Sequence, residues 1–288
     1  MSPVPPFPYY GGKSRHLKFI LPKLPATKRY CEPFAGGGSV LLSRDPVEVE
    51  TYNDLDSNVV NFFKVLRKQP VELLRSLELT PFSQEEFNNA LLVLNGELES
   101  DDLERARAFF IRATMSRGAR PYNGSWNPSI THVRYCMSGA VRNYQANLER
   151  LEAIASRLLR VQILNDDALK VIKKFDTPDT LFYIDPPYLH NSRSNAYCYK
   201  YEMSSIQHRH LAHILNNIEG YAAVSGYESE LFGELYEGWH CSKDKVNRNN
   251  EVKSEKQEIL VTNYNPVTFE KLEINRRPKQ ITLEEVLQ

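Results

Sequence analysis

The chain has 288 residues, 41% hydrophobic and 25% charged, which is typical of a soluble globular enzyme and excludes a disordered chain. Its 36 basic and 36 acidic residues cancel. No run approaches the ~20 apolar residues of a membrane-spanning helix, and the first residues lack the apolar core of a secretory signal. The four cysteines form no Cys-x-x-Cys pair, which argues against a zinc site or a disulfide framework. We therefore expect a cytoplasmic protein with no bound metal.

The neutral total hides an uneven distribution of charge. Residues 72–104 hold nine acids and one arginine, whereas residues 105–160 hold ten arginines and two acids. Aromatic side chains are interleaved with these arginines, and that combination favours phosphate contact and base stacking. The alternative is that two helices pair their opposite charges with each other.

In chain order, short apolar runs predict a series of strands. They cover residues 29–34, 49–52, 161–164, 180–184, 221–225 and 259–264. Most are continuous rather than alternating, as expected for strands buried on both faces of a largely parallel sheet. Apolar residues at helical spacing follow Asp56-Ser57 and recur over 204–218. The alternation of the two patterns predicts a doubly wound α/β sheet.

The alternation stops between residues 70 and 157. Helices are predicted there at 85–94, 103–115 and 140–159, and a polar, turn-rich loop lies at 118–128. We interpret this stretch as an inserted domain. The predicted organisation is a catalytic domain made of residues 1–70 and 158–270, an insertion at 71–157, and a charged C-terminal tail at 271–288.

A glycine-rich run, Glu32-Pro-Phe-Ala-Gly-Gly-Gly-Ser-Val40, follows the first strand and opens a helix. Glycines suit a tight turn and a close approach of the backbone to a ligand. Leu41 occupies the third glycine position of a dinucleotide fingerprint, so that class of cofactor is disfavoured. The N-terminus of the helix can bind a carboxylate, and Glu32 can bind an ammonium. S-adenosylmethionine has both groups, so the run suits that cofactor. The alternative is a glycine-rich turn with no ligand.

Acidic residues follow two further strands. Asp54 lies 18 residues after Gly36, close to the ~20-residue spacing at which an acid accepts hydrogen bonds from ribose hydroxyls. Asp167 follows the strand at 161–164, where it would meet an adenine ring. Both acids would also serve as ordinary turn or helix-capping residues.

The tetrapeptide Asp185-Pro186-Pro187-Tyr188 directly follows the strand at 180–184. Its prolines end the strand and fix an extended backbone that donates no hydrogen bonds, so carbonyl oxygens stay available as acceptors. Asp185 adds a carboxylate, and Tyr188 adds a face for stacking. The combination predicts a pocket for a planar ring that bears an amino group, and the alternative is a proline-rich turn.

Four motifs resemble, in their order, those of the DNA adenine-N6 methyltransferase family. They are Pro-Tyr-Tyr-Gly-Gly-Lys at 8–13, Glu-Pro-Phe-Ala-Gly-Gly-Gly-Ser at 32–39, Asn-Asp at 53–54 and Asp-Pro-Pro-Tyr at 185–188. The resemblance runs from about residue 7 to 265 and follows the alpha-type order, with the recognition insertion between cofactor and catalytic motifs. It implies a Rossmann-like S-adenosylmethionine-dependent methyltransferase sheet with a mainly helical target-recognition domain.

The resemblance also implies an activity: site-specific methyl transfer from S-adenosylmethionine to N6 of a flipped-out adenine in double-stranded DNA. A monomer is expected, with a cognate restriction endonuclease as an optional partner at the same site. Residues 120–128 are similar to the family's Arg-Tyr-Asn recognition loop, but Pro121 separates arginine from tyrosine and Trp126 replaces phenylalanine. These departures leave the recognition sequence open.

Individual roles follow from the same resemblance. Asp185 and the Pro186 carbonyl are expected to hold the target amine, and Tyr188 to stack on the flipped base; with Pro187 they form the predicted catalytic set. The predicted cofactor contacts are Tyr9, Gly12, Lys13, Glu32, Phe34, Ala35, Gly36, Gly38, Ser39, Asp54, Asp167 and Asp185. The predicted DNA contacts are Arg117, Arg120, Tyr122, Asn123, Trp126, Asn127, Arg134 and Arg193.

The expected mechanism needs two acceptors on one amine, which direct the nitrogen lone pair at the methyl carbon. The base must leave the duplex first, and the polar, aromatic segment at 190–201 is predicted to close over it, unless it is a plain surface loop. Alternatives for the whole chain are cytosine-N4 or RNA adenine methylation, a catalytically silent DNA-binding protein, and a nicotinamide-dependent oxidoreductase.

Overall fold

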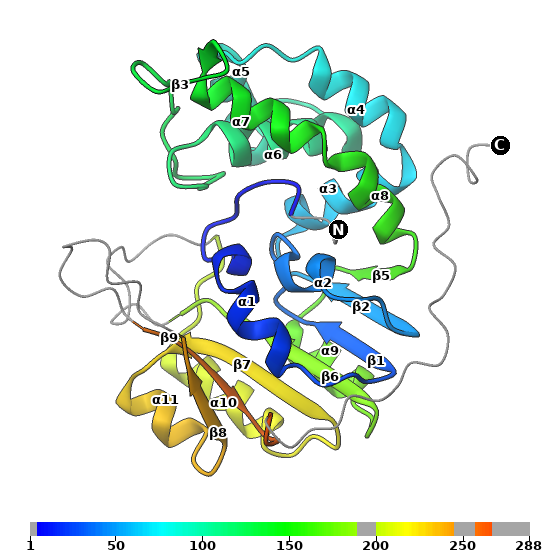
Figure 1. Ribbon diagram of the computed structural model, residues 1–288. Coiled ribbons are helices and arrows are strands. Elements are labelled where there is room, and N and C mark those ends of the chain that lie inside the picture. Colours follow the sequence, from blue (N-terminus) through cyan, green and yellow to red (C-terminus); the bar gives the residue numbers. More distant parts are fainter. Residues whose placement is uncertain (1–4, 189–199, 245–256, 267–288) are drawn as a thin grey trace.

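The computed structural model describes residues 5–188, 200–244 and 257–266. Within them a seven-stranded sheet forms one part of the molecule, and a group of helices lies beside it (Figure 1). The strand order is β5-β2-β1-β6-β7-β9-β8. The strands are β1 (Arg29–Glu32), β2 (Val49–Asn53), β5 (Val161–Leu164), β6 (Thr180–Ile184), β7 (Tyr221–Tyr227), β8 (His240–Lys243) and β9 (Glu258–Thr262).

The sheet confirms the predicted α/β class. Strands β5, β2, β1, β6 and β7 are parallel, and β9 pairs antiparallel with both β7 and β8. The chain moves outward from β1 to β2 and β5 and then returns to β6, beside β1. In a parallel sheet this reversal opens a crevice at the carboxyl ends of the two central strands. Glu32 ends β1 and Asp185 follows β6, so both lie at this crevice.

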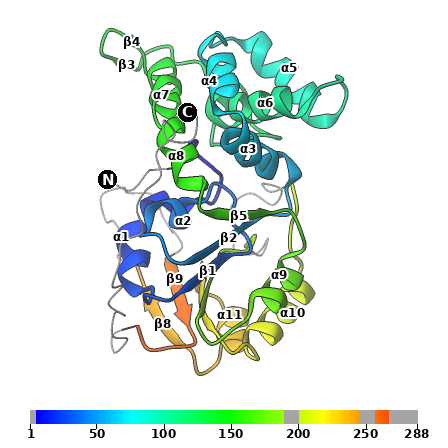
Figure 2. The same cartoon turned by 90° about the vertical axis from the view of Figure 1, so that its right-hand side faces the viewer.

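Apolar side chains alternate between the two faces of the central strands. On one face Phe182 and Ile184 pack with residues of α9 (Ala168–Phe175) and α10 (Ser205–Leu215). On the other face Leu181 and Tyr183 belong to the larger core. Figure 2 shows α9 and α10 on one side of the sheet and α1 on the other. The remaining flanking helices are α1 (Leu17–Ile20), α2 (Ser39–Ser43), α3 (Ser57–Lys68) and α11 (Glu230–Leu235), with 3-10 turns η1 (Lys13–Arg15) and η2 (Leu21–Lys23).

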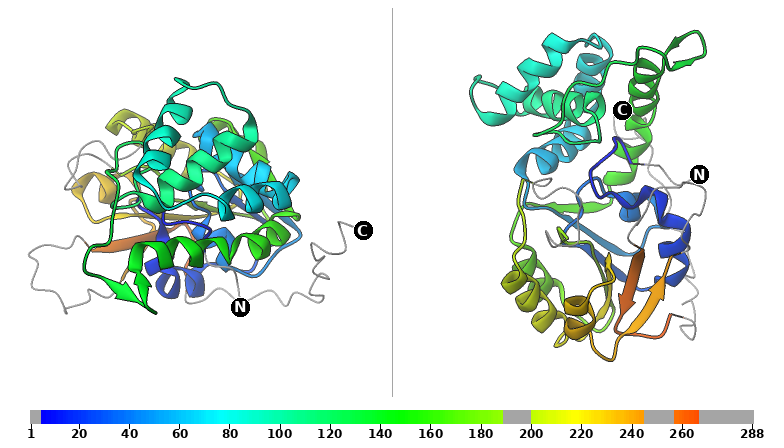
Figure 3. Two further views of the ribbon diagram at one scale, coloured as in Figure 1. Left: turned by 90° about the horizontal axis from the view of Figure 1, so that it is seen from above. Right: turned by 90° about the vertical axis from the view of Figure 1, so that its left-hand side faces the viewer.

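The helices between α3 and β5 gather at one end of the molecule, as the right-hand view in Figure 3 also shows. They are α4 (Pro70–Glu78), α5 (Gln84–Asn95), α6 (Asp102–Met115), α7 (Gly139–Leu148) and α8 (Leu151–Leu158), with a small hairpin of β3 (Val133–Arg134) and β4 (Met137–Ser138). The helix predicted over 140–159 is divided into α7 and α8 by a turn at Glu149 and Arg150. Helix α4 was not predicted.

An aromatic cluster joins these helices to the sheet. Phe7 lies 5.1 Å from Phe62 of α3 and 5.3 Å from Phe109 of α6, centroid to centroid, and all three rings are buried. Phe110 stacks on Phe62 at 5.8 Å. The two parts of the chain therefore share one apolar core. No helix of the described residues is long and apolar enough to cross a membrane.

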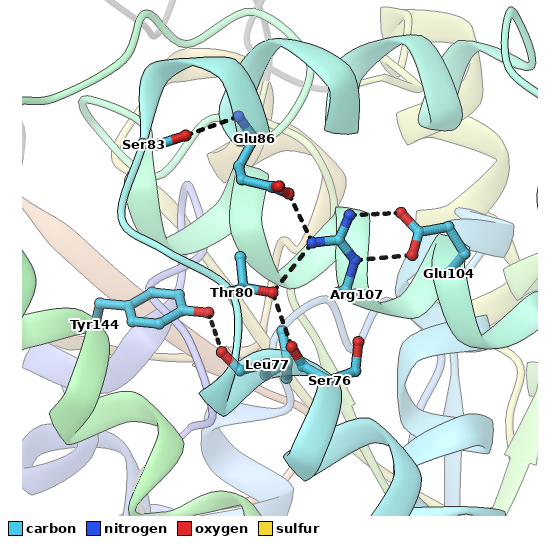
Figure 4. Close-up of polar contacts among 8 residues, drawn as sticks. All are labelled: Ser76, Leu77, Thr80, Ser83, Glu86, Glu104, Arg107 and Tyr144. Carbon is cyan, nitrogen blue, oxygen red and sulfur yellow. Dashed lines mark hydrogen bonds and ion pairs between the residues drawn. The ribbon is translucent and has the colours of Figure 1, made fainter.

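Several arginines of the basic window are used inside the protein. Arg107 of α6 binds both oxygens of Glu104 at 2.7 and 2.8 Å and reaches Glu86 of α5 at 2.7 Å (Figure 4). Arg112 is buried and donates to the Pro121 carbonyl at 2.6 Å. Arg157 forms a buried ion pair with a glutamate of β2 at 2.6 Å. For these three side chains the interpretation as a nucleic-acid surface is wrong, because burial and pairing withdraw their charge from solvent.

Candidate active site

A cavity lies at the crevice predicted by the strand order, and it measures about 170 Å³. One water molecule needs only about 10–15 Å³ by the same measure, so the space is of ligand size. Eleven of the twelve predicted cofactor residues line it: Tyr9, Gly12, Lys13, Glu32, Phe34, Ala35, Gly36, Ser39, Asp54, Asp167 and Asp185. The predicted segments, from 9–13 through to the tetrapeptide, therefore meet at one cavity.

The glycine loop between β1 and α2 takes a shape that only glycine adopts without strain. Gly36 has φ +49°, and a β-carbon there would lie 2.7 Å from the Tyr9 ring. Gly38 has φ +66° at the N-cap of α2. Gly38 is absent from the cavity lining and shapes the turn, so its cofactor contact stays a prediction.

Asp54 ties the second strand to this loop. Its Oδ2 accepts the Gly36 amide and its Oδ1 accepts the Asp56 amide, both at 2.8 Å. Burial nevertheless raises the pKa of Asp54 to about 6. Asp167 caps α9, since its Oδ1 accepts the amides of Leu169 and Lys170 at 3.0 and 3.1 Å. Asp167 also lines the cavity, so the capping role and a ligand-facing position are compatible.

Glu32 is a buried carboxyl that faces the cavity. Burial raises its pKa to about 8, although the Tyr30 hydroxyl, which donates to it at 2.5 Å, and the Arg44 guanidinium act in the opposite direction. At neutral pH the group therefore holds a proton unless a cation lies beside it. An ammonium group in the cavity would favour the ionised form.

Asp185 is paired with Lys13. The Lys13 ammonium lies 2.8 Å from Asp185 Oδ1, and it also donates to the Gly11 carbonyl at 2.8 Å. Burial alone would lower the pKa of Lys13, but the nearby carboxylates of Asp185 and Glu258 outweigh it and raise the pKa. Burial raises the pKa of Asp185, and Lys13 opposes that rise. Lys13, predicted as a cofactor contact, thus also holds the tetrapeptide carboxylate.

The other three residues of the tetrapeptide differ in their position at the cavity. Pro187 lines it, whereas Pro186 and Tyr188 do not. The Tyr188 hydroxyl donates to Glu258 Oε1 at 2.7 Å, and the Lys13 ammonium lies 4.8 Å from the ring centroid. His208 Nε2 lies 3.0 Å from the Pro187 carbonyl. The sequence interpretation missed Glu258 and His208, since each stands in a strand or helix with no local pattern that distinguishes it.

The predicted recognition loop packs against the cavity side. Arg117 and Asn123 are exposed. The Arg120 guanidinium lies 5.0 Å from the ring centroid of Tyr10, a cavity residue. The Tyr122 hydroxyl donates to Asp56 Oδ2 at 2.5 Å, so its side chain is half-buried rather than presented to solvent.

The remaining predicted DNA contacts differ in position. Trp126 is half-buried, 6.2 Å from the Phe82 ring, and its indole nitrogen is buried without a partner among the described residues. The backbone N–H of Asn127 donates to the Met115 carbonyl at 3.0 Å. Arg134 lies in β3. Arg193 lies outside the described residues, as does most of the segment at 190–201 that was predicted to close over the base.

Residues on the far side of that segment also line the cavity. They are Lys200, Tyr201, Glu202, Met203 and Gln207. Lys200 places its ammonium 3.2 Å from Asp56 Oδ1, close to the predicted recognition loop. Among the described residues no group of three histidine, cysteine or acidic side chains could hold a metal ion.

Comparison with known proteins agrees with this site. The model of the D12 class N6 adenine-specific DNA methyltransferases matches residues 9–254. The chain is 25% identical over 276 residues to the type II methyltransferase M1.LlaDCHI of Lactococcus lactis subsp. cremoris, covering 88% of this chain and 93% of that one. It is 24% identical over 294 residues to the type II methyltransferase M.MjaIII of Methanocaldococcus jannaschii, covering 91% and 99%.

A third relative is a DNA N-6-adenine-methyltransferase of Escherichia phage P1, 28% identical over 186 residues, which are 63% of this chain and 24% of that protein. The family match spans the glycine loop, the insertion and the tetrapeptide, which are the segments that build the cavity and its surroundings. The chain belongs to the D12 class of N6 adenine-specific DNA methyltransferases.

Proposed function

We propose that this chain transfers a methyl group from S-adenosylmethionine to N6 of a flipped-out adenine at a specific site in double-stranded DNA. The observation that carries the proposal is the position of Asp185, whose carboxylate faces the same cavity as the glycine loop and Glu32. An acceptor for an amine and a cradle for a nucleoside therefore share one space. Family membership supports the same activity.

The residues of the cavity fit S-adenosylmethionine. Glu32 is a buried carboxyl that an ammonium would ionise. Asp54 keeps further acceptor capacity on both carboxylate oxygens, which suits ribose hydroxyls. Tyr9 and Phe34 supply apolar surface for the remainder. When bound, the cofactor supplies an electrophilic methyl group.

The protein's own part in the reaction is to hold the target amine. Lys13 occupies Oδ1 of Asp185, so Oδ2 is the oxygen that we expect to accept one N–H of the adenine amine. The Pro186 carbonyl would accept the other. His208 contacts the Pro187 carbonyl, which keeps that oxygen from competing. Two acceptors on one nitrogen turn its lone pair out of the ring plane and toward the methyl group.

No strong base is needed before methyl transfer. The methylated nitrogen is cationic and loses its proton readily, and Asp185 is placed to accept it. Because burial raises the pKa of Asp185, its protonated form is less unfavourable there than in water. Water then removes the proton after product release.

We propose that residues 71–157 form the target-recognition domain. Arg117 and Asn123 are its exposed predicted contacts, and Tyr122 and Arg120 attach the loop to the cofactor side. Extruding the adenine costs a few kcal/mol, which contacts in this region would offset. Two of the relatives are named type II methyltransferases. We also propose that the chain acts as a monomer, with a cognate restriction endonuclease as an optional partner at the same site.

The decisive experiment expresses the chain in a host without DNA methylation and sequences single DNA molecules. N6-methyladenine in one defined sequence context is the expected result. N4-methylcytosine, or methylation found in RNA alone, would contradict the proposed acceptor.

The matched variant is Asp185→Asn, which keeps the shape of the side chain and removes its charge. We expect it to abolish methylation while S-adenosylmethionine binding, measured by calorimetry, stays within a few-fold of the parent chain. The variant leaves Lys13 without its nearest carboxylate, which could destabilise the fold. A thermal melt therefore shows whether lost activity is due to unfolding. Full activity in the variant would overturn the mechanism.

A further inference from the structure

A buried cluster of charged and polar groups lies at the wall of the cavity, and it contains one residue to which the proposed reaction gives no task. Lys13, Asp185 and Glu258 have side-chain exposures of 5%, 19% and 4%. Tyr188 is buried beside them. Glu258 is absent from the cavity lining, and its carboxylate contacts Tyr188 and Lys13 instead.

Glu258 contacts both residues that flank Asp185. Its Oε1 accepts the Tyr188 hydroxyl at 2.7 Å, and the same oxygen lies 3.6 Å from the Lys13 ammonium. Lys13 in turn lies 2.8 Å from Asp185 Oδ1. Oε1 of Glu258 thus connects Tyr188, the predicted stacking residue, with Lys13, the cation that is paired with Asp185.

The position of Glu258 is rigid. It is the first residue of β9, where its backbone is in register with Tyr227 of β7. The Tyr227 ring meets the Tyr188 ring edge-on, with centroids 4.8 Å apart. Lysine has a flexible four-carbon stem, and Tyr188 directly follows two prolines. A fixed acceptor between them selects one arrangement of both side chains.

A carboxylate in this place is costly unless it has partners. Burial raises the pKa of Glu258, Lys13 opposes the rise, and the Asp185 charge adds to it. Two buried carboxylates share a single ammonium among the described residues of the cluster. Simple packing would be served better by an apolar side chain of similar volume, since burying a charge carries a large desolvation penalty.

We propose that Glu258 is a positioning residue for methyl transfer. It fixes the Tyr188 side chain through its hydroxyl, and it keeps Lys13 on Oδ1 of Asp185 so that Oδ2 is left for the amine. This proposal rests on the proposed function, because it assigns Glu258 a task within that reaction.

The test is a double-mutant cycle on the single-turnover rate of methyl transfer to a DNA duplex that contains the target site. Glu258→Leu removes the acceptor, and Tyr188→Phe removes the donor while leaving the ring. We expect each change to slow transfer by about tenfold or more, and Glu258→Leu to slow the Tyr188→Phe enzyme by clearly less than it slows the parent enzyme, because coupled residues are non-additive. Dissociation constants for cofactor and for DNA should stay within about threefold of the parent values.

Two further variants sharpen the experiment. Glu258→Gln keeps an acceptor for Tyr188 and loses the charge that faces Lys13, so it should recover part of the rate lost in Glu258→Leu; it also carries the cycle if the leucine variant fails to fold. Glu234→Gln is the control, because Glu234 is exposed and pairs with Arg209 at the surface, at 2.6 Å. The control should methylate at the parent rate.

Additive effects of Glu258→Leu and Tyr188→Phe would overturn the proposal, as would a loss of cofactor or DNA affinity with an unchanged single-turnover rate. Failure of the proposed function is seen separately, because the parent chain would then leave the duplex unmethylated in the same assay. A parent enzyme that methylates adenine together with an additive cycle rejects the role of Glu258 alone.

Discussion

The ion pair between Arg157 and Glu50 predicts a large and specific effect on stability. Arg157 of α8 binds both carboxylate oxygens of Glu50 in β2, each at 2.6 Å, and its side chain is 6% exposed while that of Glu50 is fully buried. A second nitrogen contact reaches the Leu41 carbonyl at 3.2 Å. The pair therefore fastens the last helix of the insertion to the sheet.

The change to make is Arg157→Met, which keeps much of the side-chain volume. It leaves the Glu50 carboxylate buried without its main partner, and breaking a buried pair in this way costs about 3–5 kcal/mol. Arg44 is buried close enough to interact with Glu50, so partial compensation puts the expected loss near the lower end, about 3 kcal/mol. Urea unfolding followed by circular dichroism measures the free energy of unfolding.

The double variant Arg157→Met with Glu50→Gln separates the lost attraction from the stranded charge. Removing the charge should recover at least about half of the stability lost in the single variant, because most of the penalty belongs to the unpaired carboxylate. A loss below about 1 kcal/mol for Arg157→Met would refute the reasoning. So would a double variant as unstable as the sum of the two single changes.

Three further predictions follow from the site and its surroundings. Arg117→Ala should weaken DNA binding and lower the slope of log affinity against log salt by about one, in filter-binding titrations, because an exposed arginine that meets one phosphate releases about one counterion; an unchanged slope would argue against phosphate contact. Gly36→Ala should lower cofactor affinity in calorimetry, since the added carbon meets the Tyr9 ring at 2.7 Å and φ is +49°; affinity equal to the parent chain would show that the loop yields. Burial raises the pKa of Glu32 from 4.5 to about 8, so between these values the folded chain holds a proton that the unfolded chain has lost, and stability falls as pH rises through that window. Glu32→Gln should flatten this fall in melts from pH 5 to 9, and a parallel fall in both proteins would contradict the assignment.

The sheet could be predicted from sequence because its strands are buried. All six predicted runs became strands, and β6 is buried at every position. Strand β8 was missed because His240–Lys243 is polar and largely exposed at the sheet edge, so no apolar run distinguishes it. Helix α4 begins directly after α3, with Pro70 at its first position, and the sequence interpretation used residue 70 only as the point where the alternation stops.

The candidate site was predictable where each residue belongs to a local motif. The glycine loop and the tetrapeptide carry their geometry in consecutive residues, and both lie at the cavity. Glu258 and Lys200 reach their partners only through the fold, with Glu258 70 residues from Tyr188 and Lys200 144 residues from Asp56. Glu258 is a single glutamate before an apolar run, and no local sequence pattern predicts its contact with Tyr188.

The arginines that precede the predicted recognition loop show why a count of charges was insufficient to predict a DNA-binding surface. Arg112 and Arg117 are five positions apart, yet Arg112 turns inward to the carbonyls of Pro121 and Gly124 at 2.6 and 3.0 Å, whereas Arg117 is exposed. The inward arginine shapes the loop, because carbonyls that would otherwise be unsatisfied receive a charged donor. Tyr122 then attaches the loop to the cofactor side of the cavity through its hydroxyl. The basic window at 105–160 therefore contains buried arginines that stabilise the loop and exposed arginines that are available to DNA, and only burial distinguishes the two.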